Sequence, residues 1–153
     1  MSQYTATVVW TRAADAPFKD NKYSRAHEWR FDGGAVVKGS SAPSSVRVPL
    51  SDPTAVDPEE ALVASLSACH MLFFLSFAAS AGFVIDRYED DAVGDMGKNA
   101  KGKTAIVKVT LRPKIAWVGD APSAEKLHEL HHRSHESCYI ANSVSAEVVI
   151  EDR

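Results

Sequence analysis

The strongest hydrophobic pattern in the chain is an apolar run over residues 61–85, broken by four serines and one histidine. Asp57-Pro58-Glu59-Glu60 stands immediately before it and reads as a helix start, with Asp57 as the N-cap and Pro58 at the first helical position. Gly82 is a suitable stop at the other end. The pattern therefore predicts one helix from Pro58 to about Ser80, roughly 35 Å long at 1.5 Å per residue.

This helix is apolar nearly all round, so it must be covered on most of its sides. A run of this length can also cross a bilayer. Interruptions such as Ser65, Ser67 and His70, and the acidic flank before the run, favour a buried core helix over a membrane span. One domain of this size has little with which to cover it, so we expect a second subunit to contribute.

The rest of the pattern is a mixture of short strands and one further helix. β-branched and aromatic residues predict strands at 4–10, 25–31, 35–38, 46–50, 84–93, 104–117 and 146–151. A basic, glycine-rich turn is expected at 96–103, and a helix at 123–136. Residues 107–112 alternate, which predicts one buried and one wet face. Hairpins rather than βαβ units indicate the α+β class.

Composition narrows the class of protein further. The chain has 153 residues and fits one domain over residues 1–153. Its net charge of −3 argues against a nucleic-acid partner. No secretory signal is recognisable at the N-terminus, so we expect a cytoplasmic protein. Two cysteines do not form a secreted disulfide scaffold, and a cytoplasmic disulfide would be transient and catalytic.

Cys69 lies on one stripe of the predicted helix, with Leu66, Phe73 and Phe77 at spacings of three and four. Taken alone, this spacing favours a structural cysteine that behaves as a small hydrophobic residue. Burial raises the pKa of a thiol, and the helix dipole has little effect in mid-helix. A reactive Cys69 would therefore need a cation from elsewhere, most suitably an arginine.

Two segments of the chain resemble one known family. The run DPEEALVASLSACH at 57–70 is similar to the central-helix motif of the OsmC/Ohr family, the osmotically inducible protein C and organic hydroperoxide resistance proteins. The run SCYIANSV at 137–144 resembles the second cysteine segment of the same family. The resemblance implies an OsmC-like fold, an antiparallel hairpin-connected sheet packed around a long central helix, and an intertwined homodimer with two sites at its interface.

The resemblance also implies a chemistry. Cys69 would be the peroxidatic thiolate, which attacks an organic hydroperoxide and becomes a sulfenic acid. Cys138 would resolve it as a disulfide, and an external thiol or dithiol would reduce that bond. No metal or other cofactor is required, and no nucleic acid or membrane partner is expected. Leu66, Phe73 and Phe77 would suit an apolar alkyl tail.

The family uses an arginine and a glutamate beside the peroxidatic cysteine. Arg25 is our first choice for the arginine, with Arg30 and Arg12 as alternatives. Glu59 matches the glutamate, although ten helical residues separate it from Cys69 by about 15 Å. Either the first turn is not helical, or Glu59 serves the site of a partner chain. Its other interpretation is a carboxylate that stabilises the helix dipole.

Histidines are the last candidate chemistry. His70 points about 100° away from Cys69 around the helix, so we expect a core or interface histidine. Four more histidines recur at helical spacing on one face of the second helix, namely His128, His131, His132 and His135. With Cys138 they could ligate zinc, or His135 could tune the Cys138 thiol. The alternatives to a peroxidase are thus a metal-binding protein and a non-catalytic small-molecule binder.

Overall fold

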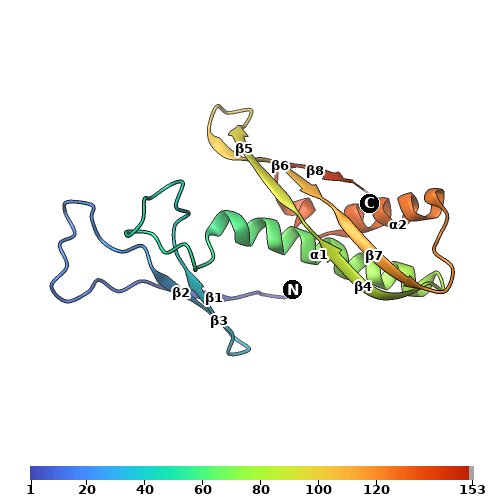
Figure 1. The fold of residues 1–153 in the computed structure, drawn as a ribbon, viewed down its shortest axis with the longest axis horizontal. Coiled ribbons are helices and arrows are strands. Elements are labelled where there is room, and N and C mark those ends of the chain that lie inside the picture. Colours follow the sequence, from blue (N-terminus) through green and yellow to red (C-terminus); the bar gives the residue numbers. More distant parts are fainter. Residues whose placement is uncertain (152–153) are drawn as a thin grey trace. The chain divides into compact units, whose positions relative to one another are not determined.

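The computed structural model describes residues 1–151, and these contain eight strands, two α-helices and one short 3-10 helix (Figure 1). The chain divides into two compact units, Met1–Ala61 and a second unit that begins at Leu62. Helix α1, Pro58–Ser80, starts in the first unit and continues through the second. The single domain expected over residues 1–153 stays a prediction.

The first unit is built on a three-stranded antiparallel sheet. Its strands are β1 (Ala6–Val9), β2 (His27–Phe31) and β3 (Val36–Gly39), in the order β1-β2-β3. Trp29 stands opposite Val8 on one side and Val37 on the other. The β2–β3 turn includes Gly34 at φ +87°, a left-handed conformation that glycine adopts without strain. The three strands confirm the predicted ones, apart from their ends.

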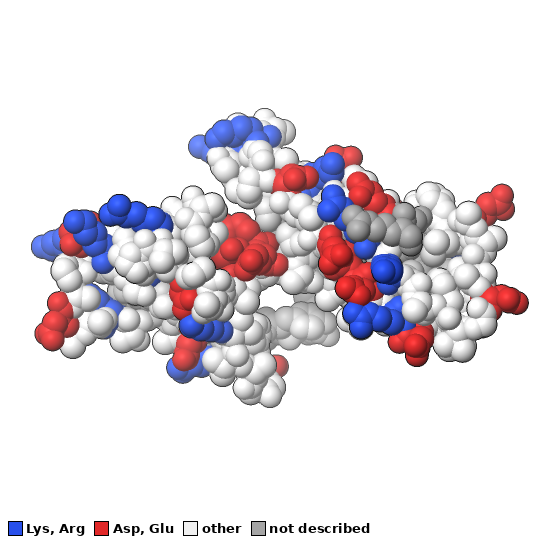
Figure 2. Space-filling view, in the orientation of Figure 1, with Lys and Arg blue, Asp and Glu red and all other residues white. Residues whose placement is uncertain are grey.

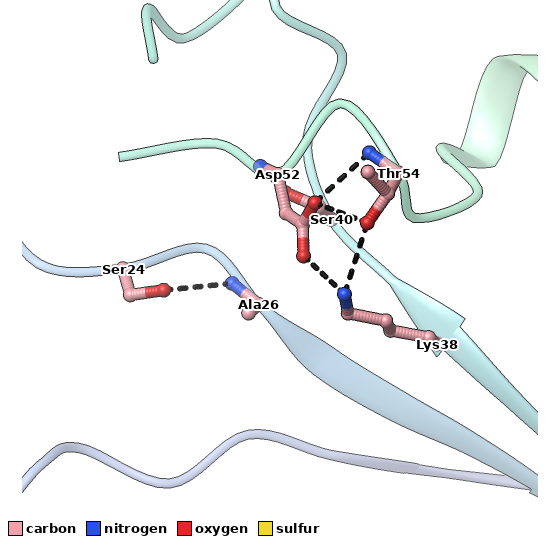
Figure 3. A network of polar contacts seen from close by, with 6 residues as sticks. All are labelled: Ser24, Ala26, Lys38, Ser40, Asp52 and Thr54. Atoms are coloured by element: carbon pink, nitrogen blue, oxygen red, sulfur yellow. Dashed lines mark hydrogen bonds and ion pairs between the residues drawn. The ribbon is translucent and has the colours of Figure 1, made fainter. Parts of the chain in front are cut away.

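The segment between β3 and α1 is fastened to β3 by a polar network (Figure 3). The Lys38 ammonium forms an ion pair with Asp52 at 2.5 Å and donates to Thr54 Oγ1 at 3.0 Å. The hydrogen bond from Lys38 is the largest cause that lowers the pKa of Asp52 to about 2. The Asp52 amide donates to Ser40 Oγ at 2.9 Å, and the Val56 amide to the Lys38 carbonyl. These bonds place the start of α1 relative to β3.

The strand predicted at 46–50 is wrong. These residues form turns, in which the Arg47 carbonyl accepts the amides of Leu50 at 3.0 Å and Ser51 at 3.3 Å. The nitrogen of Pro49 carries no hydrogen, so this position cannot donate to a strand ladder.

Helix α1 begins where its sequence predicts. The Glu60 amide donates to Asp57 Oδ1 at 2.8 Å, and the Asp57 amide donates to Glu60 Oε2 at 3.1 Å. This reciprocal pair satisfies two amides that the helix itself leaves open. The helix ends before Gly82, at φ +87°, where the Phe83 amide returns to the Ala78 carbonyl. The predicted helix is confirmed at both ends.

The second unit packs two helices against two small sheets. One sheet pairs β4 (Val84–Asp90) with β7 (Pro113–Val118), and the other has the order β5 (Val93–Lys98), β6 (Thr104–Leu111), β8 (Glu147–Ile150). Helix α2, Ala124–Ser137, and the 3-10 helix η1, Ala141–Ser143, lie between β7 and β8 in the chain. The mixture of helix and antiparallel hairpins confirms the α+β class.

Four details of the second unit differ from the sequence prediction. The segment predicted as one strand at 104–117 is two strands that break at Arg112, and the basic turn is shorter because β5 extends to Lys98. Strands β6 and β8 are parallel, whereas the other pairs are antiparallel. Val109, Thr110 and Leu111 are all buried, so both faces are covered at this end of β6. Lysines at and beside the shortened turn are exposed, namely Lys98, Lys101 and Lys103. Figure 2 shows a group of basic side chains at the top of the view.

The second unit has two apolar clusters along α1. Leu66 packs with Val109 and Leu111 of β6. Two turns further along α1, Phe74 and Ala78 pack with Leu130 of α2 and with partly buried residues of β4 and β7. The buried residues of α1 follow one stripe at intervals of four, namely Leu66, His70, Phe74 and Ala78. The rest of this apolar helix stays more open, and only 22% of its most apolar 18-residue segment is buried.

Candidate functional site: two neighbouring thiols

Cys69 lies on α1 between the two apolar clusters, one residue before the fully buried His70. Its side chain is half-buried, because the buried stripe of the helix passes through Leu66 and His70 on either side of it. Cys69 is therefore neither core filler nor a fully solvated thiol. It is a free cysteine whose side chain is partly accessible to solvent.

Cys138 caps the C-terminal end of α2 and is completely buried. Its thiol donates to the Leu66 carbonyl on α1 at 4.0 Å, and it accepts the Ala141 amide at 3.4 Å. A further hydrogen bond joins its side chain to Cys69. Burial is the largest cause that raises the pKa of Cys138, to about 11. His135, the histidine expected to tune this thiol, is not among the causes that shift the pKa of Cys138.

The structure thus brings together two of the four predicted site residues, although they are 69 positions apart in the chain. No disulfide joins the two cysteines in the described residues. A thiol pair in hydrogen-bond contact can be oxidised reversibly to a disulfide when a two-electron oxidant reaches one of the sulfurs. Cys69 is the more accessible sulfur, and Cys138 is the protected one.

Arg25 belongs to the first unit, in the segment before β2. Its guanidinium lies 3.8 Å from the centre of the Tyr23 ring and donates to the Tyr23 and Asn21 carbonyls. The Asn21 side chain accepts a third bond at 3.0 Å. All of these acceptors are neutral, and within residues 1–151 no carboxylate pairs with Arg25. Arg25 is therefore a positioned cation whose charge is not cancelled.

The His27 side chain forms a hydrogen bond with the backbone of Arg25. The Trp29 indole donates to His27 Nε2 at 2.8 Å, so the other ring nitrogen, Nδ1, carries the proton that reaches the Arg25 carbonyl at 2.8 Å. Gly39 lies against this pair, where a Cβ would stand 2.5 Å from His27 Nε2. No signal in the sequence pointed to this support of Arg25.

The other two arginine candidates differ from Arg25. Arg30 pairs with Glu28 at 2.8 Å, and both side chains are exposed. Arg12 is exposed and donates to carbonyls of its own loop, at 2.6 Å for Ala16. Of the three, Arg25 alone is half-buried, and it forms no ion pair with a carboxylate. Both properties favour Arg25 as our first choice.

Glu59 lies exposed in the first turn of α1, and that turn is helical. The explanation that the helix starts later is therefore excluded. Two interpretations of Glu59 remain, a helix-dipole carboxylate and a residue that serves the site of a partner chain.

The histidines of α2 are not equivalent. His131 is buried, His135 is half-buried, and His128 and His132 are exposed. Among residues 1–151, no three histidine, cysteine or acidic side chains come together in a way that could hold a metal ion. His70 is 1% exposed, which confirms that it is a core histidine.

Aromatic side chains continue from the two thiols along α1. Phe73 meets Phe77 at 6.1 Å and, edge-on, Tyr139 at 5.2 Å between ring centres. Tyr139 follows Cys138 directly and is 70% exposed. Leu66, which we expected beside a substrate tail, is fully buried in its own cluster and cannot serve that purpose. Phe73, Phe77 and Tyr139 thus form an aromatic group that begins one helical turn after Cys69 on α1 and one residue after Cys138.

The fold, together with two free cysteines on the central helix and at the end of α2, defines a class of small thiol proteins. A family model for OsmC-like proteins matches residues 51–152. This match covers most of the chain and both cysteines, so the protein belongs to the OsmC family. The motifs at 57–70 and 137–144 thus indicated the family correctly.

Solved structures agree with this assignment. An OsmC-like protein of unknown function from Vibrio cholerae is 51% identical, with 100% of each chain covered and a TM-score of 0.97. The organic hydroperoxide resistance protein OhrB of Bacillus subtilis is 22% identical, with 98% of each chain covered and a TM-score of 0.65.

An organic hydroperoxide resistance protein of Elizabethkingia anophelis is 16% identical, with 99% of this chain and 95% of that chain covered and a TM-score of 0.67. At these identities the latter two show a common fold and no more. A comparison with curated proteins found no match.

Proposed function

We propose that this protein reduces organic hydroperoxides, with Cys69 as the peroxidatic thiol and Cys138 as the resolving thiol. The observation that carries the proposal is the contact between the two side chains, on a fold shared with organic hydroperoxide resistance proteins. Half-burial of Cys69 leaves a path for the oxidant, and complete burial keeps Cys138 from reacting with it first.

The chemistry needs no group beyond the two thiols and a reductant. The Cys69 thiolate attacks one peroxide oxygen, the O–O bond breaks, and the alcohol leaves after taking up a proton. Cys69 is then a sulfenic acid. The Cys138 sulfur attacks the Cys69 sulfur, an S–S bond forms, and water leaves with the Cys138 proton. Two electrons from an external dithiol or two thiols, in the expected cytoplasmic setting, restore both cysteines.

The substrate class follows from the surface beside Cys69. Phe73, Phe77 and Tyr139 form an apolar wall that gains free energy by covering a hydrocarbon tail. Hydrogen peroxide has no such tail and gains nothing from this wall. An organic hydroperoxide is therefore the better substrate.

Arg25 is our candidate for the cation that stabilises the Cys69 thiolate. Its uncancelled charge and its anchoring by Tyr23 and Asn21 support this role. We expect Arg25→Gln to slow oxidation of Cys69 by about tenfold or more, because the developing negative charge at the site loses its cation and about 1.4 kcal/mol of stabilisation corresponds to a factor of ten. Stopped-flow measurement of peroxide consumption tests this, with the exposed Arg12→Gln as control. An unchanged rate in Arg25→Gln would assign the role to another cation.

A homodimer completes the proposal. A second copy of the chain would bury the apolar sides of α1 that one chain leaves exposed. It would also bring another Glu59 to the site. Glu59 would then act across the interface, where the length of the helix does not prevent it.

The direct test is thiol counting with cumene hydroperoxide as the oxidant. Wild-type protein should lose two free thiols per chain and form the alcohol. Cys69→Ser should lose all peroxide consumption, whereas Cys138→Ser should accumulate a trappable sulfenic acid at Cys69. Peroxide consumption that survives in Cys69→Ser refutes the mechanism. Binding of the hydroperoxide without any loss of thiol would identify a non-catalytic binder instead.

A further inference from the structure

Two histidines form a buried polar link between the helices that carry the cysteines. His70 on α1 and His131 on α2 are 1% and 3% exposed. His70 Nε2 lies 3.0 Å from His131 Nδ1, and the rings are stacked with their planes 10° apart. The link lies on α1 between Leu66 of one apolar cluster and Phe74 of the other.

The position of this link bears on the cysteines. Leu66 of α1 meets Cys138 at the end of α2, and Phe74, further along α1, stacks on His131 at 4.3 Å. The two helices therefore run antiparallel. The link joins His70, one residue after Cys69, to His131, seven residues before Cys138. Apolar contacts tolerate small sliding movements, whereas a hydrogen bond at 3.0 Å fixes a direction and a distance.

We propose that the His70–His131 hydrogen bond is a positioning device that holds α1 and α2 in the alignment at which the Cys138 thiol meets Cys69. The inference rests on the proposed function only for the identity of the oxidant, since the alignment itself concerns two thiols. The link acts on the sulfurs through the helices that carry them, so His70 and His131 are positioning residues.

The bond requires one ring to donate and the other to accept, which two neutral imidazoles can do and two imidazolium ions cannot. Burial, followed by the charges of His131 and His135, lowers the pKa of His70 to about 3. These two residues of α2 are the charged groups that act on His70. From the sheet, the Tyr88 ring of β4 packs on Phe74 beside the pair. The link is therefore intact through the neutral pH range.

The step that depends on the alignment is closure of the disulfide. After oxidation of Cys69, the Cys138 sulfur must approach the sulfenic sulfur so that the S–S bond forms as water leaves. A misplacement of about 1 Å at a reacting atom can lower a rate by about a hundredfold. Oxidation of Cys69 itself does not involve Cys138, so loss of the link should spare this first step.

The experiment uses diamide as the thiol oxidant, which makes it independent of peroxidase activity. Diamide takes two electrons and two protons from a thiol pair, because one sulfur adds to its N=N bond and the second sulfur then displaces it. Disulfide closure is followed by mass spectrometry of quenched samples. We expect His70→Leu, which removes the hydrogen bond but keeps an apolar side chain, to close the disulfide about tenfold more slowly or worse.

Rescue separates positioning from general stability. In His70→Gln the side-chain amide can take the place of Nε2, and we expect it to restore most of the rate. His132→Leu, on the exposed side of α2, is the matched control and should close at the wild-type rate. If His70→Leu does not fold, the double variant His70→Leu/His131→Leu is used, because it leaves no buried imidazole that has lost this hydrogen bond. Its disulfide should still close slowly. Wild-type closure in the leucine variant that folds, or slow closure in His70→Gln, overturns the proposal.

The same samples treated with cumene hydroperoxide separate the two proposals. Normal diamide closure in wild-type protein without any reaction with hydroperoxide would refute the peroxidase and leave the positioning inference standing. Equal diamide rates in wild type and in the leucine variant would refute the inference and leave the peroxidase standing.

Discussion

At the scale of single residues, the two cysteines differ because their surroundings differ. Cys138 has no exposed surface, and burial keeps its proton bound, with a pKa of about 11. Cys69 is half-buried on a helix stripe beside it. The accessible Cys69 thiol is suited to react with an oxidant. The buried, protonated Cys138 thiol is suited to react afterwards, with the sulfenic acid that forms on Cys69.

The raised pKa of Cys138 predicts how disulfide closure depends on pH. The thiolate is the nucleophile, so at pH 7 only about one Cys138 in ten thousand is ready to attack. We expect closure to accelerate by about tenfold for each pH unit between about 7 and 10, approaching a plateau near the pKa. Quenched-flow mass spectrometry at several pH values measures this rate. Formation of the sulfenic acid in Cys138→Ser, over the same range, is the control, and a flat closure profile would contradict the expectation.

At the scale of elements, α1 lies so close to β5 that one position must be glycine. A Cβ added at Gly94 would stand 2.6 Å from Cγ2 of Val63 on α1. Val63 is β-branched, so it has few rotamers in a helix with which to move aside. The approach of the helix to the sheet that covers Leu66 therefore depends on the absence of a side chain at Gly94.

We predict that Gly94→Ala lowers the free energy of unfolding by about 1–3 kcal/mol through overpacking. Urea denaturation followed by circular dichroism measures the loss. The double variant Gly94→Ala/Val63→Ala removes the clashing methyl groups and should be more stable than the sum of its two single variants implies. Simple additivity of the two changes would show that the clash is relieved in another way.

The secondary structure was predictable where its causes are local. The Asp57–Glu60 capping pair and the stop at Gly82 act within a few residues, so both ends of α1 were correct. The break at Arg112 depends on pairing with distant segments. The turns at 46–50 have a local cause, the missing amide of Pro49, which the hydrophobic pattern does not register. Hydrophobic pattern alone assigned both segments incorrectly.

At the scale of the molecule, α1 is an apolar helix that one chain covers only in part, since 22% of its most apolar 18-residue segment is buried. Leu72 is 63% exposed on this helix, and the buried stripe includes only every fourth residue. The proposed homodimer would cover this surface with a second copy of the chain.

We predict a sedimentation mass of twice the 16.6 kDa of one chain. Leu72→Asp should shift the protein toward monomer by placing a charge on this apolar surface. Leu72→Met keeps the surface apolar and should remain dimeric. Monomeric wild-type protein at micromolar concentration, or a dimer that Leu72→Asp leaves intact, would show that α1 is covered differently.

The sequence by itself determined the helix that bears Cys69, the α+β class and, through two cysteine motifs, the family. These features depend on local caps, on periodicity and on short residue patterns, which can be recognised without coordinates. The resemblance also implied that Cys138 pairs with Cys69, and the structure brings the two side chains together. Only the tertiary structure decided that His70 meets His131 and that β6 pairs with β8. His70 and His131 are 61 positions apart, and such contacts arise from the packing of whole helices, which a linear pattern does not encode.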